Sequence, residues 1–220
     1  MRIKDPAFQD MDMHSCRSDP TESSFTTNNT INIVYGTQSG TAAHCAADIK
    51  KLLLAYFKKS KVSHVPKISV LAANSMPPEQ LAHKISRCRL ALFVTCTYGE
   101  GDFPDIMKKF WKHLDSYREE VFVAMRYGVF GLGSTMYAVI DEQFNRAARL
   151  LDKKLEELGG DRIAPVCLAD DLDTTFDCGR GQWYEGKLNP WMKEILPGIM
   201  EDRTHGELSF DDELTEEDSY

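Results

Sequence analysis

The residues best suited to chemistry are small hydroxyl and amide side chains that follow an apolar, branched run at residues 31–35. Gly36 ends this run, and the next five residues read TQSGT, with a second glycine at Gly40. Residues 42–57 repeat apolar side chains at helical spacing, so the loop is expected at a helix N-terminus. The first amides of a helix lack intrahelical partners and carry the positive end of its dipole, so they bind anions without a lysine. The loop predicts a phosphate site.

This loop differs from the two common nucleotide-binding glycine motifs. It lacks the Gly-Lys-Ser/Thr ending of a triphosphate P-loop and the G-x-G-x-x-G of a dinucleotide fold, which favours a monophosphate. An ordinary strand-to-helix turn, capped by Ser39 or Thr41, would produce the same pattern. The loop alone leaves both interpretations open.

Two further glycine-containing loops follow apolar strands and carry a tyrosine each. They are residues 97–104 (TYGEGDFP) and 131–137 (GLGSTMY). Because ligands of parallel sheets bind beyond the carboxyl ends of the strands, we expect Tyr98 and Tyr137 near the phosphate loop. A planar ligand between them would gain about 0.5–1.5 kcal/mol from each aromatic pair. Either tyrosine alone would be an ordinary loop residue, but the three loops together predict a flat, phosphorylated ligand.

Five predicted strands alternate with helices. Residues 89–95 (RLALFVT), for example, form the continuous apolar run of a strand that is buried on both faces. Such alternation indicates an α/β fold with a parallel sheet covered by helices on both faces. The expected strands are 31–35, 67–71, 89–95, 125–131 and 162–168, and the expected helices are 42–57, 77–86, 105–117, 141–158 and 183–200. Pro165 places the fifth strand at an edge.

The negative charge is concentrated at the C-terminus. The 220 residues carry a formal net charge of -8, and residues 201–220 hold nine carboxylates and one arginine, which equals the whole imbalance. We expect an acidic, disordered tail there, a flexible polar arm at residues 1–30, and one domain at residues 31–200. The acidity argues against nucleic acid or an anionic membrane as a partner.

The six cysteines are scattered, with no C-x-x-C pair and no His-Cys cluster at metal-ligand spacing. No apolar run approaches the roughly 20 residues that a membrane span needs, and the first thirty residues lack the apolar core of a secretory signal. We therefore expect reduced thiols, no metal and a cytoplasmic location. Cys96 is the thiol that directly precedes an expected site loop.

Several motifs together resemble the FMN-binding, flavodoxin-like domain of the diflavin reductases. They are GTQSGTA at 36–42, CTYGEGDFPD at 96–105 with the following KKFWKHL, FGLGSTMY at 130–137, and Phe144-Asn145. They occur in matching order across about residues 31–200. The segments LGG at 158–160, PVCL at 165–168, Asp170-Asp171 and NPW at 189–191 look most like the members that serve cytosolic iron-sulfur protein assembly.

The resemblance implies a flavodoxin-like three-layer sandwich with a five-stranded parallel sheet in the order 2-1-3-4-5. It implies FMN as the cofactor, with the phosphate at residues 37–41, Tyr98 and Tyr137 flanking the flavin ring, and Asp171 near the ring edge. It implies no catalytic side chain, because the flavin carries the redox chemistry. The implied cofactor-binding residues are Thr37, Gln38, Ser39, Gly40, Thr41, Thr97, Tyr98, Gly99, Gly101, Gly131, Leu132, Gly133, Ser134, Tyr137, Asn145 and Asp171.

The resemblance also implies single-electron transfer between proteins. An acidic rim around the flavin would make the reduced flavin a stronger donor and would steer a basic acceptor; its members are Glu100, Asp102, Asp105, Asp170, Asp171, Asp173 and Asp177. The sequence contains no second dinucleotide-binding region, so we expect an NADPH-dependent FAD reductase as donor, separate or in a larger protein, and an iron-sulfur or haem protein as acceptor.

Two alternatives remain open at the level of sequence. Ser134 stands where the family usually has Asn or Asp, Ala169 replaces a usual Gly, and four extra residues lie between Tyr137 and Phe144. These departures are compatible with a flavodoxin-like binding module that has no redox activity. The segments MRY at 125–127 and VFGLG at 129–133 also suggest the flavodoxin-like domain of a tRNA-modifying enzyme, although no cluster-binding cysteine motif accompanies them.

Overall fold

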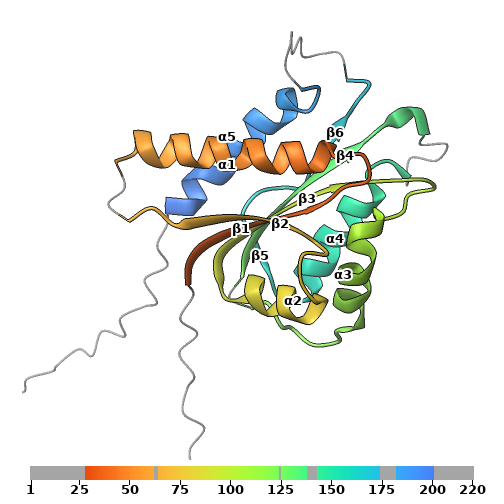
Figure 1. The fold of residues 1–220 in the computed structure, drawn as a ribbon, viewed down its shortest axis with the longest axis horizontal. Helices are drawn as coiled ribbons and strands as arrows, with labels where there is room; N and C mark the ends of the chain where they lie inside the picture. Colours follow the sequence, from red (N-terminus) through yellow and green to blue (C-terminus); the bar gives the residue numbers. More distant parts are fainter. Residues whose placement is uncertain (1–27, 62–63, 124, 138–142, 174–181, 201–220) are drawn as a thin grey trace, which may run out of the picture.

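The computed structural model describes residues 28–61, 64–123, 125–137, 143–173 and 182–200, and it shows a parallel sheet between two layers of helices (Figure 1). The strands are β1 (Asn28–Gly36), β2 (Lys67–Ala72), β3 (Cys88–Cys96), β4 (Arg126–Gly133), β5 (Asp161–Arg162) and β6 (Cys167–Asp170). Their order is β2-β1-β3-β4-β5, and β6 also pairs with β4. The predicted flavodoxin-like order 2-1-3-4-5 is therefore confirmed, with the fifth strand divided in two. The acidic tail and the arm up to residue 27 lie outside the described residues.

The division of the fifth strand follows from Pro165. β5 pairs with the start of β4, at Arg126 and Tyr127, whereas β6 pairs with its end, from Phe130 to Gly133. A proline has no amide hydrogen for the ladder between them. The Pro165 carbonyl instead accepts a hydrogen bond from the indole Nε1 of Trp191, 3.1 Å away. Both pieces lie at the β4 edge of the sheet, where a proline is tolerated.

Helices cover both faces of the sheet. α1 (Thr41–Lys59) and α5 (Glu185–Met200) lie on one face, and α2 (Pro78–Ser86), α3 (Asp105–Ser116) and α4 (Arg146–Glu157) lie on the other (Figure 1). Successive side chains of β1 serve the two layers in turn, because strand side chains alternate in direction. Ile31 and Ile33 enter the core under α1 and α5, and Val34 enters the opposite core. Across the described ranges, no helix has both the length and the apolarity that crossing a bilayer requires.

Two element boundaries differ clearly from the expected ones. β1 begins at Asn28 rather than at residue 31, because the Asn28 amide donates to the Arg87 carbonyl and extends the pairing with the α2–β3 connection. α4 begins at Arg146 rather than at residue 141. Its N-cap, Asn145, has a left-handed φ of 53°, which interrupts a helix that amphipathic spacing alone would have extended further back. The other boundaries agree within two residues.

Gly131 in β4 allows α4 to approach the sheet closely. A Cβ atom at this position would lie 2.6 Å from the Ala148 Cβ and 2.6 Å from the Asn145 Oδ1. Gly131→Ala is therefore expected to lower the free energy of unfolding by about 1–3 kcal/mol through overpacking, as measured by urea denaturation. The companion change Ala148→Gly removes one of the two clashes and should recover part of this loss. No loss in the single variant would show that α4 can shift away from β4.

Candidate functional site

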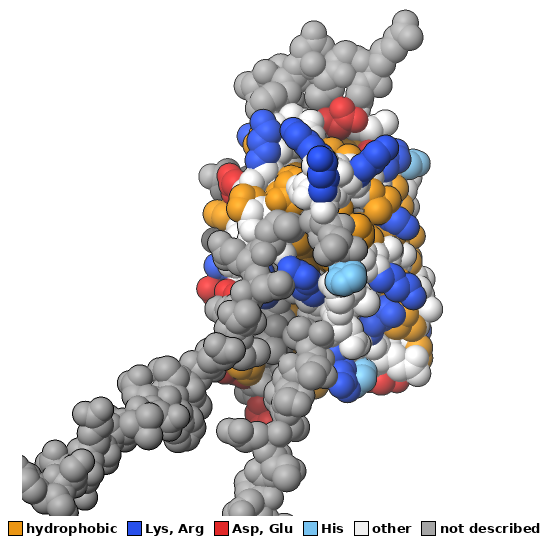
Figure 2. Space-filling view, turned by 90° about the vertical axis from the view of Figure 1, so that its left-hand side faces the viewer, with side chains coloured by type: hydrophobic (Ala, Val, Ile, Leu, Met, Phe, Trp, Pro, Cys, Tyr) orange, Lys and Arg blue, Asp and Glu red, His pale blue; other side chains and the backbone are white. Residues whose placement is uncertain are grey.

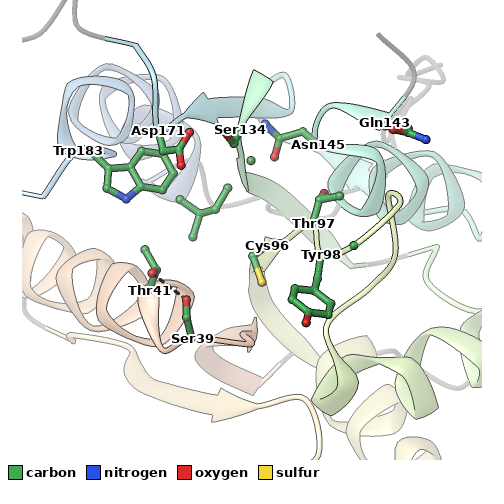
Figure 3. Close-up of a pocket in the computed structure, with 13 residues that line it drawn as sticks. Ser39, Thr41, Cys96, Thr97, Tyr98, Ser134, Gln143, Asn145, Asp171 and Trp183 are labelled. Atoms are coloured by element: carbon green, nitrogen blue, oxygen red, sulfur yellow. Dashed lines mark hydrogen bonds between the residues drawn. The ribbon is translucent and has the colours of Figure 1, made fainter. Parts of the chain in front are cut away.

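A cavity of about 500 Å³ opens at the carboxyl edge of β3 and β4, beside the N-terminus of α1. This volume lies in the range of small-molecule and cofactor sites, roughly 300–1,000 Å³. The cavity brings together residues from the four connections that follow β1, β3, β4 and β6 (Figure 3). Predicted site residues that line it are Ser39, Thr41, Thr97, Tyr98, Gly99, Leu132, Gly133, Ser134, Asn145 and Asp171; three further lining residues, Cys96, Gln143 and Trp183, were not predicted.

The phosphate loop leaves the N-terminus of α1 without a side-chain cap. Its N-cap is Gly40, which has a left-handed φ of 102°. The Thr37 Oγ1 accepts a hydrogen bond from the Gly40 amide at 2.8 Å, so it shapes the loop from within. The Ser39 and Thr41 hydroxyls lie 3.3 Å from each other, and neither caps the helix. The alternative of a turn capped by Ser39 or Thr41 is therefore not what the structure contains, and the first turn of α1 remains able to bind an anion.

Gln38 is not among the residues that line the cavity, and it connects the phosphate loop to α3. Its Nε2 donates to the Asp105 Oδ2 at 3.3 Å, and its Oε1 accepts from the Asp105 amide at 3.2 Å. The second bond occupies one of the first amides of α3, whose N-cap Pro104 offers no side-chain acceptor. The structure thus places Gln38 between two of the loops that surround the cavity.

Tyr98 lies on a tight hairpin that α4 holds in place. The amides of Tyr98 and Asp102 each donate to the other residue's carbonyl, at 2.9 and 2.8 Å. Gly99 and Gly101, with φ values of 58° and 98°, make the reversal between them. The guanidinium of Arg146, at the first position of α4, donates to the Gly101 carbonyl at 3.4 Å. The Tyr98 side chain is 54% exposed, so its ring stands at the mouth of the cavity.

Asn145 joins the ends of β4 and β6 behind the cavity. Its side chain is fully buried, and its Nδ2 donates to the Ala169 carbonyl at 3.0 Å. It packs over Gly131 and Gly133, where any larger side chain would collide with it. Its Oδ1 is buried and has no hydrogen-bond partner within the described residues. Leaving such an acceptor unpaired costs about 1–3 kcal/mol, so a bound molecule with a donor would be stabilised here.

Three of the seven predicted rim carboxylates are engaged within the protein. Asp170 accepts hydrogen bonds from the Thr135 amide and hydroxyl, at 3.0 and 2.7 Å, and from the Leu172 amide at 3.1 Å. Asp173 pairs with Lys187 at 3.3 Å, and Asp105 pairs with Lys108 at 2.6 Å. The exposed rim carboxylates outside these contacts are Glu100, Asp102 and Asp171, and Asp177 lies outside the described residues.

The cavity lining is nearly neutral. Burial raises the pKa of the Cys96 thiol, so this group is protonated at neutral pH and does not act as a thiolate. Among the described lining residues there is no Lys or Arg, and Asp171 is the one carboxylate. The described residues also contain no group of His, Cys, Asp and Glu that could hold a metal ion.

Besides Gln38, four described residues of the predicted site lie outside the set that lines the cavity. Thr37 and Gly40 shape the phosphate loop, Gly101 lies against Arg146, and Gly131 is buried under α4. Tyr137 is in the short helical turn η1 (Thr135–Tyr137), and its side chain is outside the described part of the structure. No spacing in the sequence indicated Trp183, because a long acidic loop separates it from β6.

Comparison with known proteins identifies this architecture. The family model described as flavodoxin matches residues 33–183. The chain belongs to the flavodoxin family. It is similar to solved flavodoxins in fold: a mutant of the flavodoxin from Pseudomonas aeruginosa has a TM-score of 0.56 and 22% identity, with 77% of this chain and 98% of that chain covered. Oxidised flavodoxin 1 from Bacillus cereus has a TM-score of 0.55 and 18% identity, with 76% and 97% covered.

Larger reductases also contain a similar region. NADPH-dependent diflavin oxidoreductase 1 of Bos taurus is 30% identical over 170 residues, which make up 76% of this chain and 25% of that protein. NADPH–cytochrome P450 reductase of Sus scrofa is 32% identical over 161 residues, which make up 72% of this chain and 22% of that protein. The chain therefore spans about a quarter of the length of these relatives.

FMN is the cofactor of the flavodoxin family, and the residues of this cavity fit it. The uncapped first turn of α1, with the Ser39 and Thr41 hydroxyls, suits a phosphate group. The exposed ring of Tyr98 suits a planar aromatic system, and the buried Asn145 Oδ1 suits a polar donor. The predicted cofactor is thus confirmed, and the individual contacts remain predictions.

Tyr98→Ala is expected to weaken FMN binding by about 1–3 kcal/mol, because the variant loses both ring stacking and apolar contact area. Fluorescence titration of the apoprotein with FMN measures this change. Tyr56→Ala is a suitable control, since Tyr56 is a partly buried tyrosine of α1 that contacts Phe57 and is not among the lining residues. Equal effects of the two substitutions would contradict a ring contact at Tyr98.

The Asp170 carboxylate gives the site a defined pH dependence. Burial raises its pKa, but the hydrogen bonds from Thr135 and Leu172 outweigh burial and hold the pKa below its ordinary value of 3.8. A carboxylate with a depressed pKa contributes stability above its unfolded pKa and loses it as the pH falls through the folded pKa.

Asp170→Asn should therefore lower the thermal unfolding midpoint at neutral pH, because Asn offers a weaker acceptor to Thr135. The difference from the unmodified protein should shrink as the pH drops below 3.8. Calorimetry at a series of pH values measures both midpoints. A difference that stays constant down to the acid end would mean that the charge of Asp170 contributes nothing to these bonds.

Proposed function

We propose that this chain is an FMN-dependent electron carrier that receives electrons from an NADPH-dependent FAD reductase and passes them singly to an iron-sulfur or haem protein in the cytoplasm. Bound FMN supplies the chemistry, because a flavin can take up two electrons and release them one at a time. The observation that carries the proposal is the position of the cavity, which opens at the sheet edge beside a 54% exposed Tyr98. A ring held there would have an edge within reach of a partner protein.

The side chains around the cavity have distinct roles in this proposal. The α1 N-terminus and the neighbouring hydroxyls of Ser39 and Thr41 anchor the phosphate, and Asn145 offers its unpaired Oδ1 to a donor of the cofactor. Buried Leu132 and the protonated Cys96 thiol exclude water from the inner wall. Asp171 contributes the single negative charge among the described lining residues, which disfavours the accumulation of further negative charge nearby.

The proposal of donor and acceptor rests on the relatives and on the surface charge. The relatives are named as an NADPH-dependent diflavin oxidoreductase and an NADPH–cytochrome P450 reductase. Figure 2 views the molecule at the end where α1 and α5 finish, and Lys and Arg side chains are more numerous than Asp and Glu side chains on its described part. The exposed carboxylates Glu100 and Asp102 lie at the opposite edge, on the Tyr98 hairpin. This asymmetry favours the approach of a basic acceptor to the cavity edge.

Reconstitution tests the function directly. The apoprotein is titrated with FMN and followed by absorbance, and the loaded protein is then mixed under anaerobic conditions with NADPH, an FAD-containing reductase and a basic haem protein. We expect haem reduction that requires all components. Tight FMN binding without reduction or re-oxidation of the flavin would instead support a binding module that has no redox activity.

The acidic rim should control electron transfer more strongly than the acidic tail does. The last carbonyls of α5 are bound by two arginines from the amino ends of strands: Arg89 donates to the Ile199 carbonyl and Arg126 to the Gly198 carbonyl. α5 therefore ends at the edge of the sheet opposite the cavity. Screening over roughly 8–10 Å at physiological salt weakens the pull of charges attached at that end.

Neutralising the rim with Glu100→Gln and Asp102→Asn should slow reduction of a basic acceptor several-fold at low salt and flatten the salt dependence. Removal of residues 201–220 should change neither the rate of acceptor reduction nor its salt dependence. Stopped-flow rates across an ionic-strength series measure both effects, with FMN affinity determined in parallel as a control. If the truncation slows transfer more than the rim variant does, the tail takes part in docking.

A further inference from the structure

Exposed cations gather at the amino edge of the sheet, opposite the cavity. Within the described residues, none of their side chains forms a hydrogen bond or an ion pair. The sequence has no carboxylate in residues 28–36, 52–70 or 80–90, the segments that form this part of the edge. We call these cations the basic surface; its members are Lys58, Lys59, Lys61, Lys67, Lys84 and Arg87.

Backbone pairing places these cations close together. Lys67 begins β2 and pairs with Thr30 of β1. On the other side of β1, the Asn28 amide donates to the Arg87 carbonyl at 2.8 Å. Because neighbouring strands lie about 4.8 Å apart, the backbones of Lys67 and Arg87 are about 10 Å apart across the sheet. The other four cations lie in the last turns of α1 and α2 or just after α1, which lead into β2 and β3.

Helix dipoles account for only part of this charge. Lys58 and Lys59 are in the last turn of α1, and Lys84 is in the last turn of α2. Each helix C-terminus carries about half a negative charge, so the two ends together offset about one of the six positive charges. The remaining charges repel one another, and an anionic partner would relieve this repulsion.

Exposed apolar side chains lie among the cations. Leu54 is 46% exposed and precedes Lys58 by one turn of α1, and Val65 is 47% exposed and stands two residues before Lys67. Figure 2 shows hydrophobic side chains between Lys and Arg side chains at this end of the molecule. A partner that fits this surface therefore carries carboxylates with apolar side chains among them.

The chain itself contains a segment of this composition. Residues 201–220 hold nine carboxylates and one arginine, and residues 207–214 (ELSFDDEL) place two leucines and a phenylalanine among four of these carboxylates. No other stretch of the sequence has so many carboxylates and so few cations.

This segment also begins next to the basic surface. The Arg89 guanidinium donates to the Ile199 carbonyl at 2.7 Å and to the Asn29 Oδ1 at 3.5 Å, so α5 ends beside the first residues of β1 and β3. The ends of α1 and α5 lie on the same side of the molecule (Figure 1). Seven residues separate Met200 from Glu207, and such a length reaches at most about 25 Å. The basic surface is within that reach.

We propose that residues 207–214 bind the basic surface of the same chain, with their carboxylates against its Lys and Arg side chains and their apolar side chains against Leu54 and Val65. The proposal depends neither on FMN binding nor on electron transfer. Bound in this way, the segment closes the basic surface to other polyanions. The cavity stays open, because it lies at the opposite edge of the sheet.

Carbodiimide cross-linking of the full chain tests the contact, since this reagent joins carboxylates to lysines that touch them. At low salt we expect links from residues 207–214 to lysines of the basic surface, and their loss at high salt. Lys109 and Lys112, two exposed lysines of α3 on the other face of the sheet, serve as the internal reference and should form no such links. Equal linking to the reference lysines would overturn the proposal.

An equal mixture of ¹⁴N and ¹⁵N chains shows whether the contact is made within one molecule. Links that join only peptides of the same isotope support binding within the chain. Links between the two isotopes would assign the segment to the basic surface of a second copy and overturn the proposal as stated.

Paired charge variants provide a second measurement. Lys59→Gln with Lys67→Gln should raise the rate at which a glutamate-specific protease cleaves residues 207–214 by about two- to tenfold, as expected for the loss of two exposed ion pairs. Lys109→Gln with Lys112→Gln makes the same change of charge on α3 and should leave the rate unchanged. Equal cleavage rates in both variants and in the unmodified chain would contradict the contact.

Anionic lipid is the competing occupant of this surface, and phosphatidylserine vesicles distinguish it. The unmodified chain should not sediment with them. The chain with Asp211→Asn, Asp212→Asn and Glu213→Gln should bind, because its basic surface is no longer covered. Vesicle binding by the unmodified chain that Lys59→Gln with Lys67→Gln abolishes would overturn the proposal and assign the surface to a membrane.

Discussion

The exposed positive end of α1 is the constraint on which the site depends. Gly40 begins the helix in a left-handed conformation, and no side chain caps the first turn. In most helices a Ser, Thr, Asp or Asn would satisfy one of these amides, at a gain of about 1 kcal/mol. Here Thr37 bonds to the Gly40 amide, and Ser39 and Thr41 lie against each other. The free protein forgoes a local stabilisation that a bound phosphate restores, which couples FMN binding to folding.

The remaining loops are held by contacts within the protein rather than by the cofactor alone. Gln38 joins the phosphate loop to the start of α3, Arg146 joins the Tyr98 hairpin to α4, and Asn145 joins the ends of β4 and β6. Each contact links two segments that are far apart in the chain. Such preorganisation lowers the entropy lost on binding, because the loops are ordered before the ligand arrives. These side chains therefore contribute to affinity even where they do not touch the cavity.

Local sequence patterns predicted most of the fold and most of the residues that line the cavity. Apolar runs such as residues 89–95 indicated the strands, because strands buried on both faces consist of apolar residues. The glycine-containing loops after three of these runs indicated the site, because glycine permits close approach of the chain to a ligand. Three features could not be predicted from local residue types. They are the division of the fifth strand at Pro165, the start of α4 at Arg146 and the position of Trp183 in the cavity wall. They depend on a paired edge, on a left-handed Asn145 and on packing between α1 and α5. Such tertiary contacts override local propensity.

Contacts within the protein reduce the number of rim carboxylates whose charge is free to act on a partner. Counting acidic residues predicts seven rim charges, but Lys108 and Lys187 pair with Asp105 and Asp173 and offset their charges. Asp170 stays charged and holds Thr135 in place through hydrogen bonds. The charges that remain exposed on the Tyr98 hairpin, Glu100 and Asp102, lie beside the cavity mouth. Meanwhile the 16 residues of α5 extend roughly 24 Å from the cavity edge to the opposite one. Among the described residues, exposed carboxylates thus lie beside the cavity and Lys and Arg side chains prevail at the opposite end, so this part of the molecule has its signs of charge separated along the strand direction.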